Sequence, residues 1–364
     1  MTPRAPRRYD ESDAKVRPNP RGSRPRSKNR PAHDAAVPGF VVAVDRGRFT
    51  VAGVGADHMT VMAVKARELG RHGIVVGDRV DIVGDVSGED GVLARIVRRD
   101  PRERALRRSA DDEDDTERIL VANADRLAIV ASLAQPEPNP RFIDRCLVAA
   151  FDAGLSALIV ATKADLASAD ALAAAYRPLG VPVIATRRVT REGADGGAAP
   201  RSGAPTEGAA NAHAAAYAIE GLDDLLAECR DQITVLVGSS GVGKSTLVNA
   251  MVPDALRSVG IVNAVTGRGR HTSTSAVALP LPQGGWIIDT PGVRTFGLAH
   301  VKVEHFVHAF PDVAAAADAC PRGCTHEDAL SGCALDAWAD TPDRVARVES
   351  IRRLIASRAA SDSQ

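Results

Sequence analysis

The sequence predicts a multidomain protein in which an all-β barrel of the OB type is followed by an α/β domain and by a small α-helical domain. Three observations support this prediction. Residues 38–99 consist of short Val/Ile-rich runs separated by turn residues, as in a small antiparallel barrel. From Arg126 onwards, strand and helix patterns alternate, which indicates a parallel sheet. The C-terminal region has a helical pattern around a cluster of Cys and His residues.

The composition excludes several classes of protein. The 364 residues suffice for about two or three domains, and the 46 basic side chains balance 46 acidic ones, so this is not a uniformly basic coat protein. No apolar run reaches about 18 residues and no apolar core follows the basic N-terminus, which argues against a membrane span and a secretory signal. Five Cys are too few for a disulfide scaffold. We therefore expect a cytoplasmic protein with no membrane partner.

Shifts in composition set the expected domain boundaries. Residues 1–36 hold ten Lys or Arg against four acidic residues and lack apolar periodicity, which predicts a disordered basic arm, or else a purely solubilising tail. The other expected segments are an OB-type barrel over 37–99, a charged linker over 100–120, an α/β domain over 121–300 with a flexible insertion at 187–216, a helical domain over 301–358 and a tail over 359–364. An SH3-like barrel would give the same pattern in the second segment.

A phosphate-binding loop is the clearest motif. The pattern G-x-x-x-x-G-K-[ST] lies between a predicted strand at 233–237 and a predicted helix from Thr246. Its residues are Gly238, Ser239, Ser240, Gly241, Val242, Gly243, Lys244 and Ser245. Backbone N–H groups of such a loop face the phosphates, the Lys reaches the β- and γ-phosphates, and the Ser binds Mg²⁺.

Two further motifs select GTP over ATP. Asp289-Thr290-Pro291-Gly292 follows a predicted strand, as D-x-x-G does in GTPases, where the Asp contacts Mg²⁺ through water and the Gly meets the γ-phosphate. The guanine motif N/T-K-x-D is matched by Thr162, Lys163, Ala164 and Asp165. A carboxylate at its last position accepts from guanine N1–H and N2–H₂, a donor pair that adenine lacks. The two motifs together disfavour a P-loop kinase.

The order of the motifs is reversed relative to ordinary GTPases. The guanine motif at 162–165 precedes the phosphate loop at 238–245, so the sequence predicts a circularly permuted GTPase sheet. Residues Ile184-Ala185-Thr186 are a candidate base-contacting loop in this arrangement. The permutation places D-T-P-G directly before the C-terminal helical domain.

A structural zinc site is predicted in that last domain. Three Cys and one His lie within 14 residues, a closed tetrahedral ligand set. The four ligands are Cys320, Cys324, His326 and Cys333. Cys146 and Cys229 fall on predicted helix faces, and we expect them to be small buried apolar residues.

The barrel, permuted GTPase motifs and Cys/His cluster together resemble the bacterial ribosome small subunit-dependent GTPase A family over roughly residues 38–355. "GRGRHTST" at 267–274 is similar to its switch I and "DTPGVRTFGL" at 289–298 to its switch II. The resemblance implies a monomeric enzyme that hydrolyses GTP to GDP, binds the small ribosomal subunit and its rRNA, and acts late in subunit maturation. An alternative is an rRNA-binding module whose GTPase fold only senses nucleotide, with negligible turnover.

The catalytic assignment rests on switch I. Val293 stands where Ras-like enzymes place the Gln that orients the attacking water, and Val cannot do so. His271 is the candidate for that role. The alternative interpretation of His271 is a surface residue that contacts rRNA. The expected Mg²⁺ ligands are Ser245, Asp289 and a threonine of switch I. Both Thr272 and Thr274 are candidates for that threonine, and we assign the role to Thr274. Gly241 occupies the place of an Asn that helps some GTPases bind a monovalent cation, so no such site is expected by that route.

Overall fold

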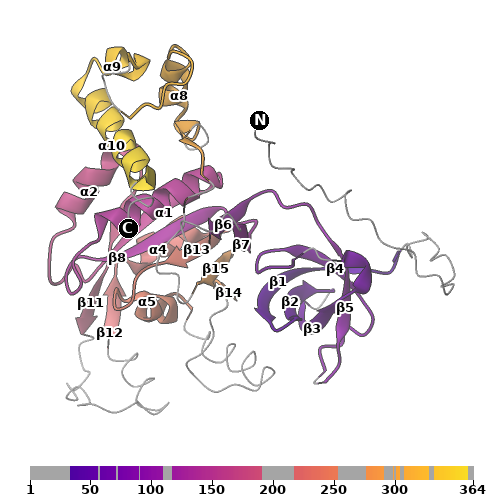
Figure 1. The fold of residues 1–364 in the computed structure, drawn as a ribbon. Coiled ribbons are helices and arrows are strands. Elements are labelled where there is room, and N and C mark those ends of the chain that lie inside the picture. Colours follow the sequence, from indigo (N-terminus) through magenta and orange to yellow (C-terminus); the bar gives the residue numbers. More distant parts are fainter. Residues whose placement is uncertain are drawn as a thin grey trace, which may run out of the picture. The chain divides into compact units, whose positions relative to one another are not determined.

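The computed structural model describes most of the chain (Figure 1). The described residues are 33–55, 58–70, 73–89, 91–109, 117–190, 217–252, 276–290, 298, 301–303, 307–327 and 332–359. The described residues from Ala35 onwards belong to one compact unit. The expected basic arm at 1–36 therefore lies almost wholly outside the described residues.

The first five strands close into a barrel. They are β1 (Val37–Asp45), β2 (Arg48–Val54), β3 (Met59–Lys65), β4 (Arg79–Val83) and β5 (Ala94–Arg99), with the 3-10 helix η2 at Arg67–Leu69. They pair in the order β1-β2-β3-β5-β4, and β4 pairs back to β1. The β3–β5 pairing is parallel and the others are antiparallel. Val41, Ile82 and Ile96 fill the interior without exposure, and the predicted OB-like barrel is confirmed.

The expected linker at 100–120 is not a simple connector. Strands β6 (Ala105–Ser109) and β7 (Glu117–Ala122) pair antiparallel across it. Leu106 and Val121 are fully buried in the core that also contains the first helix of the α/β domain. Most residues in this segment are charged, so the sequence pattern did not indicate the few apolar side chains that are buried in strands. Its acidic stretch at 110–116 lies outside the described residues.

The α/β part is a mostly parallel sheet of six strands. Its spatial order is β10 (Val183–Ala185), β9 (Ser156–Thr162), β8 (Arg126–Ser132), β13 (Ile233–Val237), β15 (Trp286–Asp289) and β14 (Val277–Pro280). Only β14 runs antiparallel, and it also bridges to β1 through Ala43 and Val277. Because β9, β13 and β15 are parallel, the three GTPase motifs that follow them lie at one edge of the sheet.

Helices line both faces of this sheet. They are α1 (Pro140–Asp152), α2 (Asp170–Tyr176), the 3-10 helix η3 (Arg177–Leu179), α4 (Leu222–Cys229) and α5 (Lys244–Met251). Asn139 caps α1, since its side chain accepts from Phe142 N at 3.1 Å and Pro140 takes the first helical position. One core contains α1 and a separate core contains α4 and α5. Cys146 and Cys229 are fully buried in these cores, as predicted.

The insertion expected at 187–216 has ordered ends. Residues Arg187–Thr190 form β11 and pair antiparallel with β12 (Tyr217–Glu220). Arg187 forms an ion pair with Glu220 at 2.5 Å, and the Arg188 guanidinium lies 4.4 Å from the centre of the Tyr217 ring. An exposed two-stranded ribbon has little apolar periodicity, which is why the sequence pattern did not reveal it. Residues 191–216 lie outside the described range.

The C-terminal helices share the core of the α/β part. They are α8 (Pro311–Ala317), α9 (Ala334–Trp338) and α10 (Pro342–Ala359). Ile351 and Leu354 of α10 are fully buried in the core that contains α1. Arg353 donates to the buried carboxylate of Asp144 on α1 at 3.1 Å; burial raises the pKa of Asp144 and Arg353 opposes that rise. None of the described helices is long and apolar enough to cross a membrane.

Candidate nucleotide site and metal cluster

The phosphate loop joins β13 to α5 at the sheet edge. Helix α5 begins at Lys244, directly after Gly243, whose φ of 93° favours glycine. Gly238 is also required, because a Cβ there would lie 2.7 Å from the Val130 carbonyl oxygen. The loop therefore approaches β8 closely, and the start of α5 presents free N–H groups suited to an anion.

Lys244 connects the phosphate loop to the D-x-x-G segment. Its Nζ lies 2.9 Å from Asp289 Oδ1 and donates to the Thr290 carbonyl oxygen at 2.9 Å. The Thr290 hydroxyl in turn donates to the Leu236 carbonyl oxygen of β13 at 2.7 Å. These contacts hold the expected phosphate-binding Lys beside the expected metal-binding Asp. Ser245 and Thr246 lie exposed in the first turn of α5.

The guanine motif follows β9 and contacts the phosphate loop. Thr162 is buried, and its hydroxyl donates to the Val242 carbonyl oxygen at 2.5 Å. Lys163 donates from Nζ to the Gln135 carbonyl oxygen. Ala164 N donates to the Thr186 carbonyl oxygen at 3.1 Å, and Asp165 is exposed. The structure thus brings Thr162–Asp165 together with the phosphate loop and with the candidate base-contacting segment that ends at Thr186.

One loop at this edge of the sheet was not predicted from the sequence. Residues 133–137 follow β8, and Leu133 N donates to the Thr162 carbonyl oxygen at 2.9 Å. Ser132 Oγ donates to the Pro136 carbonyl oxygen at 2.6 Å, and a Cβ at Gly241 would lie 3.9 Å from Pro136. The Pro-rich run "QPEPNP" after a buried strand is the signal that could have identified this loop.

The predicted switch I residues and part of switch II are not among the described residues. His271, Thr272, Thr274, Gly292 and Val293 all lie outside the described residues. The water-positioning role of His271 and the choice between the two switch I threonines therefore stay predictions.

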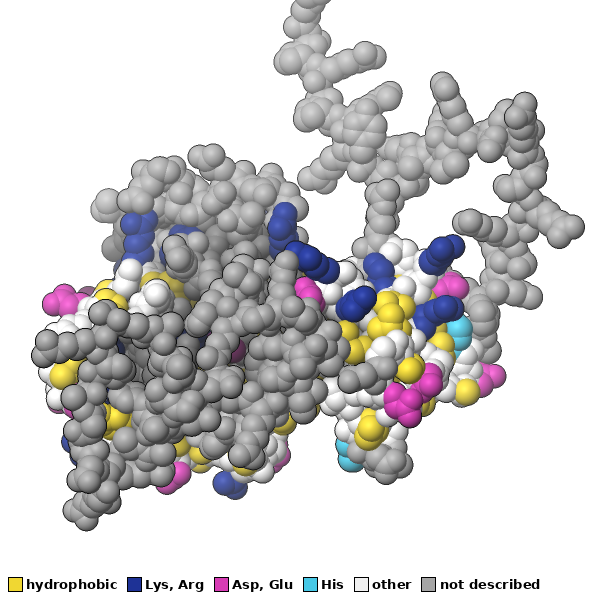
Figure 2. Space-filling view, turned by 90° about the horizontal axis from the view of Figure 1, so that it is seen from below, with side chains coloured by type: hydrophobic (Ala, Val, Ile, Leu, Met, Phe, Trp, Pro, Cys, Tyr) yellow, Lys and Arg dark blue, Asp and Glu magenta, His cyan; other side chains and the backbone are white. Residues whose placement is uncertain are grey.

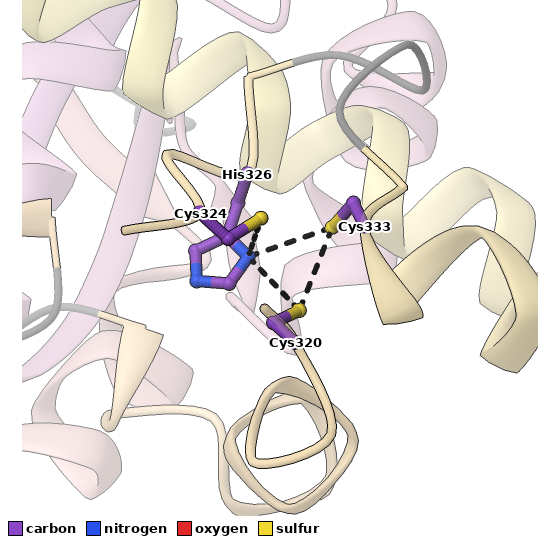
Figure 3. Close-up of side chains that lie close together, drawn as sticks. All are labelled: Cys320, Cys324, His326 and Cys333. Carbon is purple, nitrogen blue, oxygen red and sulfur yellow. Dashed lines mark hydrogen bonds between the residues drawn. The ribbon is translucent and has the colours of Figure 1, made fainter. Parts of the chain in front are cut away.

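The four predicted metal ligands converge between α8 and α9 (Figure 3). Their ligand atoms all lie within 4.8 Å of one another. His326 Nδ1 is 3.6 Å from Cys320 Sγ and 3.5 Å from the sulfur atoms of Cys324 and Cys333. The sulfur atoms of Cys320 and Cys333 are 3.8 Å apart.

These distances fit a tetrahedral zinc site. A zinc ion about 2.3 Å from sulfur and about 2.0–2.1 Å from nitrogen keeps two sulfur ligands roughly 3.8 Å apart and a nitrogen roughly 3.5 Å from sulfur. Burial raises the pKa of the Cys333 thiol to about 11; a backbone hydrogen bond at Leu335 opposes the rise, and the thiols of Cys324 and Cys320 add to it. A divalent cation would favour the thiolates, which are the metal-binding form.

Backbone and arginine contacts fix the ligands of this cluster. Ala334 N donates to Cys320 Sγ at 3.3 Å. Arg352 of α10 donates to the His326 carbonyl oxygen at 3.2 Å and to Asp336 Oδ1 at 2.8 Å. The cluster is thereby attached to the helix that packs on α1.

Comparison with known proteins identifies the family. The family model described as RsgA GTPase matches residues 99–196 and 207–299. The chain belongs to the RsgA GTPase family. Membership makes it a GTPase, a hydrolase that acts on GTP.

Two relatives in the RsgA family carry the name "Small ribosomal subunit biogenesis GTPase RsgA". The protein from Gemmatimonas aurantiaca is 37% identical over 264 residues, which cover 72% of this chain and 76% of that protein. The protein from Pseudomonas syringae pv. tomato is 34% identical over 292 residues, which cover 78% of this chain and 75% of that protein.

Two solved structures share the RsgA-family fold. YjeQ from Thermotoga maritima has a TM-score of 0.58 and 22% identity, over 89% of this chain and 99% of that chain. YloQ, described as a circularly permuted GTPase, has a TM-score of 0.58 and 20% identity, over 91% of this chain and 98% of that chain. The permuted GTPase fold predicted from the motif order is therefore confirmed.

Proposed function

We propose that this GTPase binds the small ribosomal subunit, hydrolyses GTP with stimulation by that subunit, and assists its late maturation. The observation that carries the proposal is the similarity, over about three quarters of the chain, to proteins named for small ribosomal subunit biogenesis. The three loops at one sheet edge supply the nucleotide chemistry. We further propose that the protein is a cytoplasmic monomer.

GTP lies across the three loops in this proposal. The carboxylate of Asp165 accepts from the guanine N1–H and N2–H₂ groups. The remaining contacts come from Thr162, Lys163, Ala164, the phosphate loop at 238–245, Thr246, Asp289 and Gly292. Lys244 neutralises charge on the β- and γ-phosphates, to which its position at the start of α5 is suited.

Magnesium fits the donor set at this edge. The Ser245 hydroxyl and the Asp289 carboxylate are hard oxygen donors, and Asp289 lies beside Lys244. Thr274 is the proposed third ligand. When bound, Mg²⁺ supplies charge stabilisation at the phosphates, while Asp289 and Ser245 hold it and His271 orients the attacking water.

One structural zinc ion is proposed at Cys320, Cys324, His326 and Cys333. The ligand distances and the closed Cys₃His set support this assignment. Zinc here joins the segment that follows α8 to the residue that precedes α9, and so stabilises the small helical region, which has little apolar core of its own.

Basic side chains are proposed to contact rRNA. On the barrel, Arg46, Arg48, Arg67 and Arg95 are exposed. Figure 2 shows Lys and Arg side chains around a hydrophobic patch on the barrel. Such residues suit phosphate contacts, and the ten Lys or Arg at 1–36 add to them.

A co-sedimentation experiment tests the proposal. Purified small subunits should carry the protein down with a non-hydrolysable GTP analogue and much less with GDP, because γ-phosphate contacts order the switches. Binding should weaken steeply as salt is raised. Equal binding with GDP and with the GTP analogue would contradict the proposal that the nucleotide controls binding to the small subunit.

The second candidate function is an rRNA-binding nucleotide sensor with negligible turnover. The observation that favours it is Val293 in the place of a water-orienting Gln. Single-turnover hydrolysis in the presence of small subunits distinguishes the two, since a sensor gains no turnover.

A further inference from the structure

The two-stranded ribbon of β11 and β12 begins at the nucleotide edge of the sheet. Strand β10 runs parallel to β9 and ends directly before Thr186, whose carbonyl oxygen accepts from Ala164 N at 3.1 Å. Thr186 N in turn donates to the Ala161 carbonyl oxygen at 2.8 Å. Arg187, the first residue of β11, therefore directly follows a residue that is hydrogen-bonded to the guanine motif.

The second strand of the ribbon returns to the same end of β10. Glu220, the last residue of β12, lies opposite Arg187 in the strand register. The next residue is Gly221, with a φ of 79°, and a Cβ there would lie 2.2 Å from the Ala185 carbonyl oxygen. Only glycine fits this close approach. The backbone therefore holds both Arg187 and Glu220 close to the guanine motif.

Glu220 and Asp165 both act on the guanidinium of Arg187. Arg187 Nε lies 2.5 Å from Glu220 Oε2, and about half of each side chain is exposed. The pKa of Arg187 is raised, first by its hydrogen bond to Glu220 and by the charge of Glu220, and also by the charge of Asp165. Arg187 is therefore paired with Glu220 while it lies within electrostatic reach of Asp165.

An arginine beside Asp165 is a competitor of the base. The proposed recognition of guanine requires the exposed carboxylate of Asp165 to accept from N1–H and N2–H₂. A guanidinium also donates parallel N–H groups to a carboxylate, so it competes for the same oxygen atoms. Arg187 would weaken guanine binding unless another acceptor engaged it. Glu220 is such an acceptor.

We propose that Glu220 is a positioning residue, which holds the guanidinium of Arg187 on the ribbon and so leaves the carboxylate of Asp165 free to bind guanine. The inference rests on the proposed binding of GTP across the three loops. It gives β11 and β12 a role in guanine binding that lies outside the guanine motif itself.

Substitutions of the ion pair distinguish this role from mere support of the ribbon. Glu220→Gln releases Arg187, so affinity for mant-GDP and mant-GTP should fall by about 3–5-fold, the effect of one exposed ion pair. Arg187→Gln, alone or combined with Glu220→Gln, should bind within about twofold of the parent chain, because the competitor is gone. An ion pair that only supported the ribbon would make both single variants lose the same affinity. That result, or undiminished affinity in Glu220→Gln, overturns the proposal.

The loss in Glu220→Gln should also depend on the charge of Asp165. In an Asp165→Asn background, measured with xanthosine triphosphate, adding Glu220→Gln should change affinity by less than about twofold, since no carboxylate remains to attract Arg187. A loss as large as in the parent background contradicts the proposal. Failure of Asp165→Asn to bind the xanthosine nucleotide would contradict the guanine motif on which the proposal depends.

Glu228→Gln is the matched control. Glu228 forms a partly exposed ion pair with Arg126 at 2.6 Å, and Arg126 begins β8 at the opposite edge of the sheet. This variant should bind guanine nucleotides as the parent chain does. A parent chain that binds no guanine nucleotide would contradict the proposed function, whereas a binding parent with an unaffected Glu220→Gln variant contradicts only the role of Glu220. The two failures are therefore distinguishable.

Discussion

The nucleotide edge and the metal cluster are built in different ways. The nucleotide edge combines Thr162, Lys244 and Asp289, which are far apart in sequence and meet because parallel strands end together. The metal cluster draws its four ligands from Cys320–Cys333, around turns between two short helices. The first site is held by sheet hydrogen bonds and two large cores, and the second by local turns and by the zinc ion that we propose. Damage to either site should therefore leave the other largely intact.

The largest expected effect is at the nucleotide edge. Lys244→Ala should reduce GTP hydrolysis by about 10²–10³-fold, because a charge that stabilises the transferring phosphoryl group is lost. Steady-state phosphate release measures this. Lys302→Ala, an exposed lysine near the C-terminal helices, serves as the control. Loss of zinc in Lys244→Ala would contradict the independence of the two sites.

The converse change is Cys324→Ala in the metal cluster. Purified parent protein should contain about one zinc per chain, and the variant should lose it. Its melting temperature should fall by roughly 5–10 °C, for a loss of ~2–3 kcal/mol, while nucleotide affinity stays near the parent value. Cys146→Ala should retain the metal, because Cys146 is buried in the core around α1. Freshly purified parent protein without zinc rules this assignment out.

Guanine selectivity gives a smaller and more specific effect. Asp165→Asn should weaken GTP binding and improve binding of xanthosine triphosphate, because the amide donates where the carboxylate accepted. Competition binding with the two nucleotides measures the shift, and Asp170→Asn in α2 provides an exposed carboxylate control. GTP binding equal to that of the parent would show the guanine motif to be misassigned.

The smallest effect is expected in switch I. His271→Ala should keep GTP affinity and slow hydrolysis by about 10–100-fold, since only water positioning is lost. Comparing nucleotide affinity with single-turnover rate separates the two. An unchanged rate would leave His271 as a surface residue suited to rRNA contact.

The sequence predicted the parts of the fold that have strong local signals. The phosphate loop has a fixed spacing, the barrel strands alternate with turns, and the four metal ligands lie close together, so each was found without a structure. The β6–β7 pair was not predicted, because Leu106 and Val121 are two buried side chains in a segment whose other residues are mostly charged, and this composition is typical of an exposed linker. The bond from Thr162 to Val242 was also missed, because it joins loops 80 positions apart and no local pattern encodes such a contact.

The most direct test of the proposed function is single-turnover GTP hydrolysis with and without purified small ribosomal subunits. The parent chain should hydrolyse GTP slowly alone, because Val293 cannot orient water, and at least about tenfold faster with small subunits. Large subunits should give no such increase. A rate that small subunits leave unchanged would contradict the proposed small-subunit-stimulated GTPase, even if GTP, magnesium and zinc all bind as proposed.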